Sequence, residues 1–190
     1  YYMVIRDWSS DVCSSDLSAC PAQLIRNLEH FISQGAMDIV GMGINTVKQL
    51  VNAGLLQDIS GLYRLTKDDL MKLEGFGDKK ADNLLAAIET SKSQSLARLI
   101  NALGIRGVGE VAAQDLSRRF HDLNELSQVT AEQIETIEGF GPSIAENLTE
   151  WFASPDNHEM LARLKASGVW PVSEEQAASG PQPLNGLTFV

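Results

Sequence analysis

The sequence predicts an all-α fold in which one unit, consisting of a helix, a tight glycine turn and a second helix, is used four times. The phrase apolar-x-Gly-apolar-Gly recurs, and its first glycines, Gly41, Gly75, Gly107 and Gly139, are 34, 32 and 32 residues apart. A near-constant period of this length is typical of a repeated supersecondary unit. Apolar residues at helical spacing and several helix-start signals lie between the turns. We expect the four units to form two pairs.

The first expected helix lies in the segment PAQLIRNLEHFISQ, which begins at Pro21. Its apolar residues recur at spacings that place them on one helix face, and they are Leu24, Ile25, Leu28, Phe31 and Ile32. This face must pack against the repeats that follow.

Each glycine turn is expected to join its two helices tightly. Two glycines permit positive φ angles and close backbone approach, and we expect positive φ at Gly77 and Gly141. The apolar residue between the glycines would plug the junction of the helices. Four residues after each second glycine comes a small or β-branched residue, where the second helix must approach the first: Val47, Ala81, Ala113 and Ala145.

Helix-start signals agree with this division of the chain. Thr66 with Asp69 resembles a capping box, and Thr130 with Gln133 matches one. Pro142 stands where the first turn of a helix tolerates proline.

Composition limits the classes of function. The chain has 190 residues, 44% of them apolar, and no apolar run long enough to span a bilayer, so we expect a soluble globular protein. Its formal net charge of -10 argues against binding polyanions by bulk attraction. Two cysteines, Cys13 and Cys20, provide no disulfide framework, which indicates an intracellular protein.

Residues 1–17 stand apart from the rest of the chain. They repeat Ser-Ser-Asp at 9–11 and 14–16, show no helical or strand periodicity, and resemble translated sequencing adapter. We expect this segment to be an artefact, with a disordered natural tail as the alternative. Cys13 belongs to it, and two thiolates cannot complete a tetrahedral zinc site. The three histidines, His30, His121 and His158, are expected at the surface.

The four units resemble the helix-hairpin-helix motif. In such a unit, backbone amides at the glycine turn and the positive end of the second helix can hold a phosphate oxygen, so that an acidic chain can still bind DNA without reading its bases. A purely structural role, in which the turns only pack helices or dock a partner, is the alternative. The expected DNA-binding residues are Gly41, Met42, Gly43, Gly75, Phe76, Gly77, Lys79, Lys80, Arg106, Gly107, Val108, Gly109, Gly139, Phe140 and Gly141.

The flanking segments resemble the bacterial NAD-dependent DNA ligase family over 18–190. The segments that carry this resemblance are SACPAQLIRNLEHFISQGAMDIVGMG, LARLINALGIRGVGE and PLNGLTFV. The resemblance implies that residues 18–23 end a four-cysteine zinc finger, with Cys20 as its fourth ligand. It further implies a helix-hairpin-helix DNA-binding domain over 24–170. A flexible linker over 171–183 and the first strand of a BRCT domain over 184–190 would follow.

The family resemblance also implies what the parent protein does. NAD-dependent ligases seal nicks by passing AMP from NAD through an active-site lysine to the 5′-phosphate, and they use magnesium and zinc. No catalytic residue is expected in this chain and no cofactor is expected to bind it, because the adenylation and oligonucleotide-binding domains precede the matching region in that family. The expected partners are nicked duplex DNA and those domains, with no membrane. The expected location is the bacterial cytoplasm, with the nucleoid.

Two alternatives remain open. Another helix-hairpin-helix repair or recombination subunit would lack the Cys-Pro-Ala-Gln entry and the BRCT-like exit. A helical scaffold that binds no DNA would suit the acidity of the chain, and a salt-dependent shift assay on duplex DNA separates it from the ligase interpretation.

Overall fold

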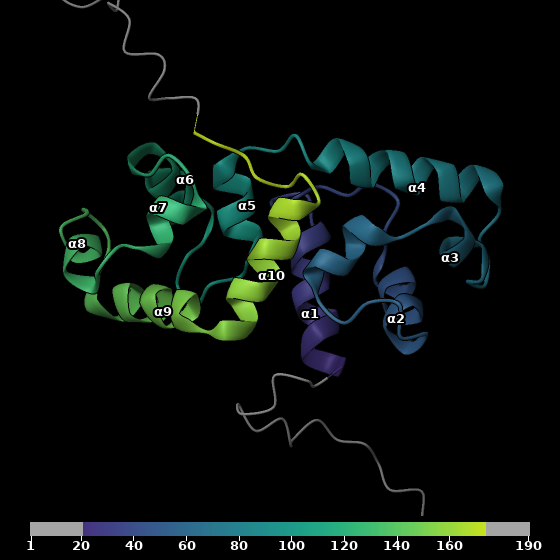
Figure 1. Ribbon diagram of the computed structural model, residues 1–190, viewed down its shortest axis with the longest axis horizontal. Coiled ribbons are helices and arrows are strands. Elements are labelled where there is room, and N and C mark those ends of the chain that lie inside the picture. The colour runs from purple at the N-terminus through teal and green to yellow at the C-terminus, as the bar shows by residue number, and fades with distance from the viewer. Residues whose placement is uncertain (1–20, 174–190) are drawn as a thin grey trace, which may run out of the picture.

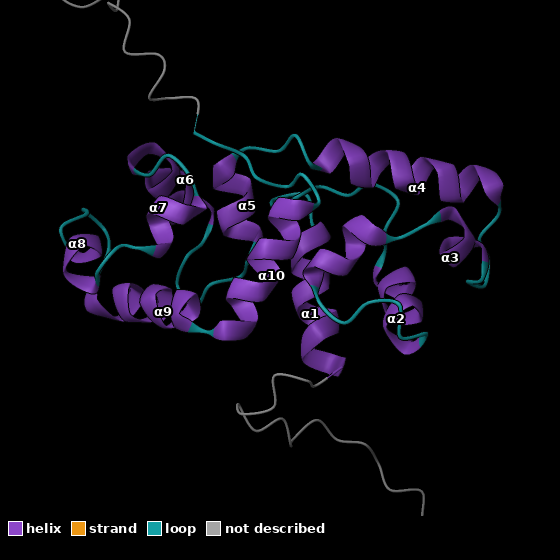
Figure 2. Ribbon diagram, in the orientation of Figure 1, coloured by secondary structure: helices purple, strands orange, loops and turns teal. Residues whose placement is uncertain are grey.

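Residues 21–173, the part of the chain that the computed structural model describes, form an array of helices (Figure 1). Figure 2 shows helices joined by loops and turns and no strand within these residues. The predicted all-α fold is confirmed. The expectations for residues 1–17, for Cys20, for most of the linker and for the strand at 184–190 lie outside the described residues.

The first half of the array begins with the predicted amphipathic helix. Leu28, Phe31 and Ile32 are buried on its inner face, while Leu24 and Ile25 pack against the edge of the core. The elements of this half are α1 (Pro21–Ile32), α2 (Ile44–Asn52), the 3-10 helix η1 (Ile59–Arg64), α3 (Lys67–Met71) and α4 (Asp78–Ser91).

The second half repeats the scheme and ends with an additional helix. Its elements are α5 (Leu96–Ala102), α6 (Glu110–Arg119), α7 (Leu123–Ser127), α8 (Ala131–Glu135), α9 (Pro142–Ala153) and α10 (Pro155–Ala166). We call the four glycine turns hairpin 1 (39–43), hairpin 2 (73–77), hairpin 3 (105–109) and hairpin 4 (137–141).

Helices on either side of each hairpin pack directly on one another: α1 on α2, α3 on α4, α5 on α6, and α8 on α9. The four small residues predicted at these contacts, Val47, Ala81, Ala113 and Ala145, are all fully buried. Close approach of the paired helices is therefore confirmed. Hairpin 1 differs from the others because α1 ends at Ile32, and hydrogen-bonded turns such as Ala36 N to Ser33 O (3.0 Å) occupy the chain before it.

The helix α1 of the first half and the helix α10 of the second half lie in the middle of the molecule (Figure 1). The first-half helices α2, α3 and α4 lie to one side, and α5 to α9 lie to the other. Contacts agree with this arrangement, since α1 packs on α2, η1 and α5, while α10 packs on α9 and η1. The two central helices therefore hold the halves together.

The segment after α10 folds back on the second half. The indole Nε1 of Trp170 lies 3.5 Å from Oδ2 of Asp122, and the amide of Ser173 donates to the carbonyl of His121 at 2.8 Å. The ammonium group of Lys165 lies 4.7 Å from the centre of the Trp170 ring. These contacts fix α10 against the junction of α6 and α7.

Helix starts follow the predicted signals. Both capping boxes, Thr66 with Asp69 and Thr130 with Gln133, are present, and Pro142 is in the first turn of α9. The Thr66 hydroxyl, together with the Lys72 ammonium and the Thr66 amide, holds the pKa of Asp69 below its ordinary value.

Candidate nucleic-acid interface

The two glycines of each hairpin have different roles. The first glycine adopts the left-handed region in every hairpin, with φ of 89° at Gly41, 76° at Gly75, 83° at Gly107 and 89° at Gly139. The second glycine is extended and is the N-cap of the following helix, with φ of -119° at Gly77 and -88° at Gly141. The expectation of positive φ at Gly77 and Gly141 is therefore wrong. The backbone reverses at the first glycine, and the second one only has to start the helix.

The helices that follow the hairpins have no side-chain cap. Gly43, Gly77, Gly109 and Gly141 are their N-caps, and none can supply an acceptor to the first-turn amides. By contrast, η1, α3, α5, α7 and α8 begin at Asp58, Thr66, Ser95, Asp122 and Thr130, whose side chains each accept from a backbone amide. The exception is α10, which follows Ser154 without a side-chain bond. Of the first-turn amides of these helices, those of Lys80 and Ile144 donate to the Gly77 and Gly141 carbonyls at 3.1 and 3.0 Å, and Pro142 has no amide proton. The other first-turn amides of α2, α4, α6 and α9 are left for an external acceptor.

Space is open where such an acceptor would approach. A Cβ atom placed on Gly43, Gly77, Gly109 or Gly141 would meet no atom within 4 Å. A Cβ on Gly107 would lie 3.2 Å from Cγ1 of Ile144. Hairpin 3 therefore packs against the start of α9, which brings the two hairpins of the second pair together.

The apolar residues between the glycines are mostly core residues. Met42, Val108 and Phe140 are buried, as predicted for plugs, so each of them can reach DNA only through its backbone. Phe76 is half-buried, and the Lys80 ammonium lies 4.0 Å from the centre of its ring. Hairpin 2 alone among the four therefore presents part of an aromatic side chain.

The cations predicted near the hairpins are exposed. Lys79 and Arg106 have no ion-pair partner within residues 21–173, whereas Lys80 lies over Phe76 and donates to the Gly75 carbonyl at 3.4 Å. Sequence reasoning missed the carboxylates of Glu74 and Glu138, which stand exposed immediately before the positive-φ glycines of hairpins 2 and 4. Hairpins 1 and 3 have Val40 and Arg106 there, so the four hairpins differ in local charge.

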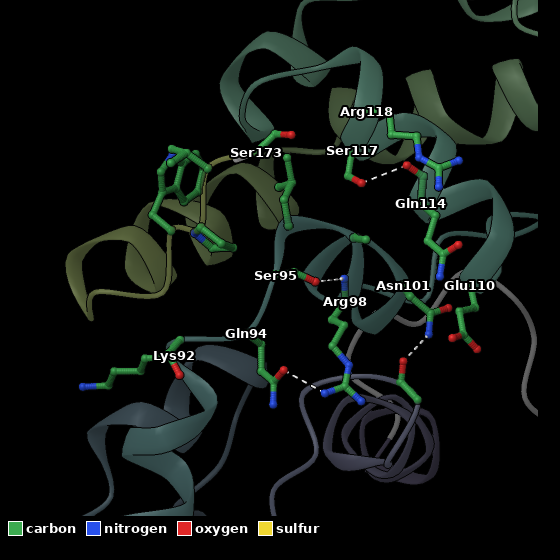
Figure 3. A pocket seen from close by; sticks show the side chains of 17 residues that line it. Lys92, Gln94, Ser95, Arg98, Asn101, Glu110, Gln114, Ser117, Arg118 and Ser173 are labelled. Atoms are coloured by element: carbon green, nitrogen blue, oxygen red, sulfur yellow. Dashed lines mark hydrogen bonds between the residues drawn. The ribbon is translucent and has the colours of Figure 1, made fainter. Parts of the chain in front are cut away.

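The groove drawn in Figure 3 is lined by polar groups that already bind one another. The Arg98 guanidinium donates to Oε1 of Gln94 at 2.7 Å, and the Arg98 backbone amide donates to the Ser95 hydroxyl oxygen. The Asn101 side-chain amide donates to the Gly35 carbonyl at 2.9 Å. Lys92 pairs with Glu89 at 2.6 Å. This groove is a seam between the turn after α1, the segment 92–101, α6 and residues 170–173, and it is not the best candidate for a ligand.

None of the described helices is both long and apolar enough to cross a membrane. Within residues 21–173, no three His, Cys, Asp or Glu side chains gather where they could hold a metal ion. His30, His121 and His158 are exposed, as predicted, and the Nε2 atom of His30 lies 2.7 Å from the Asn101 carbonyl oxygen.

Two family models match this chain, and each of them covers one pair of hairpins. Residues 34–90, which hold hairpins 1 and 2, match the model described as a SAM-like helix-hairpin-helix tandem. Residues 98–161, which hold hairpins 3 and 4, match the model of the helix-hairpin-helix motif. The predicted grouping of the four units as two pairs is confirmed.

Curated relatives match about nine-tenths of the chain. A DNA ligase of Trichlorobacter lovleyi is 49% identical over 172 residues, which are 90% of this chain and 25% of the relative. The chain belongs with the helix-hairpin-helix region of bacterial DNA ligases. A DNA ligase of Herpetosiphon aurantiacus is 47% identical over 173 residues, or 91% of this chain and 26% of the relative, and one of Roseiflexus is 46% identical over 172 residues. The chain thus spans about a quarter of the length of these ligases.

Proposed function

We propose that this chain is the DNA-holding region of an NAD-dependent ligase that seals nicks during replication and repair. The observation that carries the proposal is the N-cap pattern: the four helices that follow hairpins begin with glycines in open space, and the other helices with a described N-cap, except α10, are capped by their own side chains. The four hairpins form two pairs, and the free backbone amides of each hairpin could donate hydrogen bonds to phosphates of a duplex. The relatives named DNA ligase support the assignment to a ligase.

The contact would be made by local dipoles and not by bulk charge. A net charge of -10 opposes the approach of DNA, but amide groups at a helix start act over a few ångströms and are little affected by distant carboxylates. Nearby carboxylates, Glu74 and Glu138 in hairpins 2 and 4 and Asp78 and Glu110 in the first turns of α4 and α6, would weaken the contact locally. Such contacts hold the backbone and do not distinguish bases. This geometry supports the proposal that the chain binds a duplex without regard to its base sequence.

Nucleotidyl transfer would depend on other parts of the parent protein. In this proposal the adenylation and oligonucleotide-binding domains supply the lysine, NAD and magnesium sites, and Cys20 is one ligand of a zinc finger that precedes α1. A BRCT domain would follow the linker. The parent protein would act in the cytoplasm, on the nucleoid.

Two experiments test the proposal. In the first, fluorescence anisotropy measures binding of the chain to nicked duplexes of several sequences across a range of salt concentrations. We expect similar affinity for all sequences and a linear fall of log K with log salt. A chain that binds none of them would instead be a helical scaffold.

In the second experiment, this chain replaces the matching region of the Trichlorobacter lovleyi ligase. We expect the chimera to seal a nick when NAD is supplied and not with ATP in its place. A chimera in which the matching region is deleted is the control. Sealing by the deletion variant as fast as by the chimera would contradict the proposal.

A further inference from the structure

A groove lies between α1 and hairpin 3, two segments that are far apart in sequence. One wall is formed by Arg26, Asn27 and His30 of α1, and the other by residues 101–105 together with Val108 and Gly109. Gly109 is the N-cap of α6, a helix without a side-chain cap. The groove therefore places side chains of α1 beside one of the four helix starts described above.

No carboxylate from residues 21–173 lines this groove. Three other grooves of the molecule each include at least one, namely Glu110, Glu125, and Asp58 with Asp69. Glu29 and Glu110 follow Asn27 and Gly109 closely in sequence, but neither is among the lining residues. In a chain with 25 acidic residues, an anion beside Arg26 would therefore meet no carboxylate in the lining of this groove itself.

Hydrogen bonds hold the two walls of the groove together, while the guanidinium group of Arg26 is exposed and can bind a ligand. The Nε2 atom of His30 lies 2.7 Å from the Asn101 carbonyl oxygen, and the Asn101 side chain donates to the Gly35 carbonyl at 2.9 Å, so α1 is held against α5. Arg26 and Asn27 are exposed and make no hydrogen bond or ion pair within residues 21–173. Some other helix cations are engaged, such as Arg163 with Glu159 and Lys67 with Asp82.

We propose that α1 is part of the DNA interface and that Arg26 binds a backbone phosphate of the duplex next to hairpin 3, with Asn27 as a second donor. This inference rests on the proposed function, because the phosphate belongs to the same duplex that the hairpins hold. A guanidinium group can bind a phosphate through two hydrogen bonds. Because α1 lies in the middle of the molecule, the contact lets one strand engage this helix and the second pair of hairpins together.

The test compares two arginine variants of the full chain. Arg26→Gln removes the proposed contact. Arg119→Gln removes the same charge from another exposed position, at the far end of α6 about 15 Å from its hairpin. We expect Arg26→Gln to weaken binding of nicked duplex about three- to ten-fold and to lower the salt slope by about 0.9. Arg119→Gln should bind like the parent chain. Equal affinities of the two variants would overturn the inference.

A second readout distinguishes duplex from free phosphate. Amide signals of Asn27 and Gly109 are followed by NMR during titration with nicked duplex, and separately with inorganic phosphate at matched ionic strength. We expect the duplex to shift both signals and phosphate to shift neither. Equal shifts with phosphate would replace the duplex contact by a small-anion site and so overturn the inference.

Failure of this inference can be told apart from failure of the proposed function. If the parent chain binds nicked duplex and substitution of Gly141 weakens that binding, the proposed function stands, and an unaffected Arg26→Gln variant overturns only the role of α1. If the parent chain binds no duplex, both fail together.

Discussion

Arg163 on α10 donates a hydrogen bond to Asp58 at the start of η1, and the resulting ion pair joins the two halves of the molecule across 105 positions of sequence. Asp58 also accepts from the amide of Gly61 at 3.1 Å and from the hydroxyl of Ser60 at 2.5 Å. The hydrogen bond to Glu159, followed by the charge of Asp58, raises the pKa of Arg163 above its ordinary value. One carboxylate thus caps a helix and holds the final helix in place.

Replacement of Asp58 should destabilise the fold more than replacement of Arg163. Asp58→Ala removes an N-cap as well as the ion pair, and loss of an N-cap alone costs about 1 kcal/mol. Arg163→Met keeps the cap and much of the apolar stem, so a smaller loss is expected. Urea denaturation of both variants measures the difference. Glu159→Gln, which removes only an exposed partner of Arg163, is the control and should change stability least.

The two glycines of hairpin 4 should respond differently to alanine. Gly139 has a φ of 89°, where an alanine costs about 1–2 kcal/mol, whereas Gly141 has an ordinary extended conformation and open space for a Cβ. Gly139→Ala should therefore lower the melting temperature clearly, and Gly141→Ala only slightly. Thermal denaturation followed by circular dichroism distinguishes them, and equal losses would contradict the different roles assigned to the two glycines.

Gly141 should matter more for DNA than for folding. Valine at this position projects a branched side chain toward the first-turn amides of α9, where a phosphate would approach, so binding of nicked duplex should weaken about ten-fold or more. Anisotropy and circular dichroism are measured on the same sample. A Gly141→Val variant that keeps both its helix content and its affinity would count against the hairpin contact.

Lysines near hairpin 2 should contribute little individually. Lys79→Ala removes an exposed cation and should lower the salt slope by at most about 0.9, with a modest fall in affinity. Lys80→Ala also removes the cation from above Phe76. If either change abolished binding at moderate salt, side-chain charge would dominate over backbone amides.

Alkaline pH should destabilise the fold through Tyr63. Burial raises the pKa of Tyr63 to about 12, although the hydrogen bond with Ser91 at 3.0 Å works in the opposite direction. Because the unfolded tyrosine ionises near its ordinary value of 10.0, stability is fully present below that pH and falls as the pH rises toward 12.

The corresponding measurement is urea denaturation of the parent chain and of Tyr63→Phe at a series of pH values. A difference of two pKa units corresponds to roughly 3 kcal/mol at most. The parent chain should lose more stability than the variant between neutral pH and pH 12. Parallel curves for the two proteins would show that Tyr63 does not titrate as a buried group.

The four hairpins could be predicted from sequence because their signals are local. Two glycines around an apolar residue, followed by a small residue such as Ala81 or Ala145, define the turn and the helix contact within nine positions. Thr66 and Thr130 predict helix starts for the same reason. The different roles of the glycines could have been recognised, since Gly77 directly precedes the first residue of a helix and an N-cap is normally extended.

Other features had weak local signals or none. η1 and α7 are too short to show apolar periodicity, although Asp58 and Asp122 are typical N-cap residues and could have indicated them. The Asp58–Arg163 ion pair and the groove between Arg26 and Gly109 join segments distant in sequence. Such partners depend on how helices pack, which a repeat pattern does not specify.

The position of α10 has a consequence for synthesis of the protein. A nascent chain can close each hairpin soon after its second helix leaves the ribosome, because the contacts of a hairpin are local. The orientation of one tandem relative to the other is completed only when Arg163 emerges and reaches Asp58. Until then the two tandems contact each other through the packing of α1 on α5, and a pause in translation before α10 would prolong that intermediate.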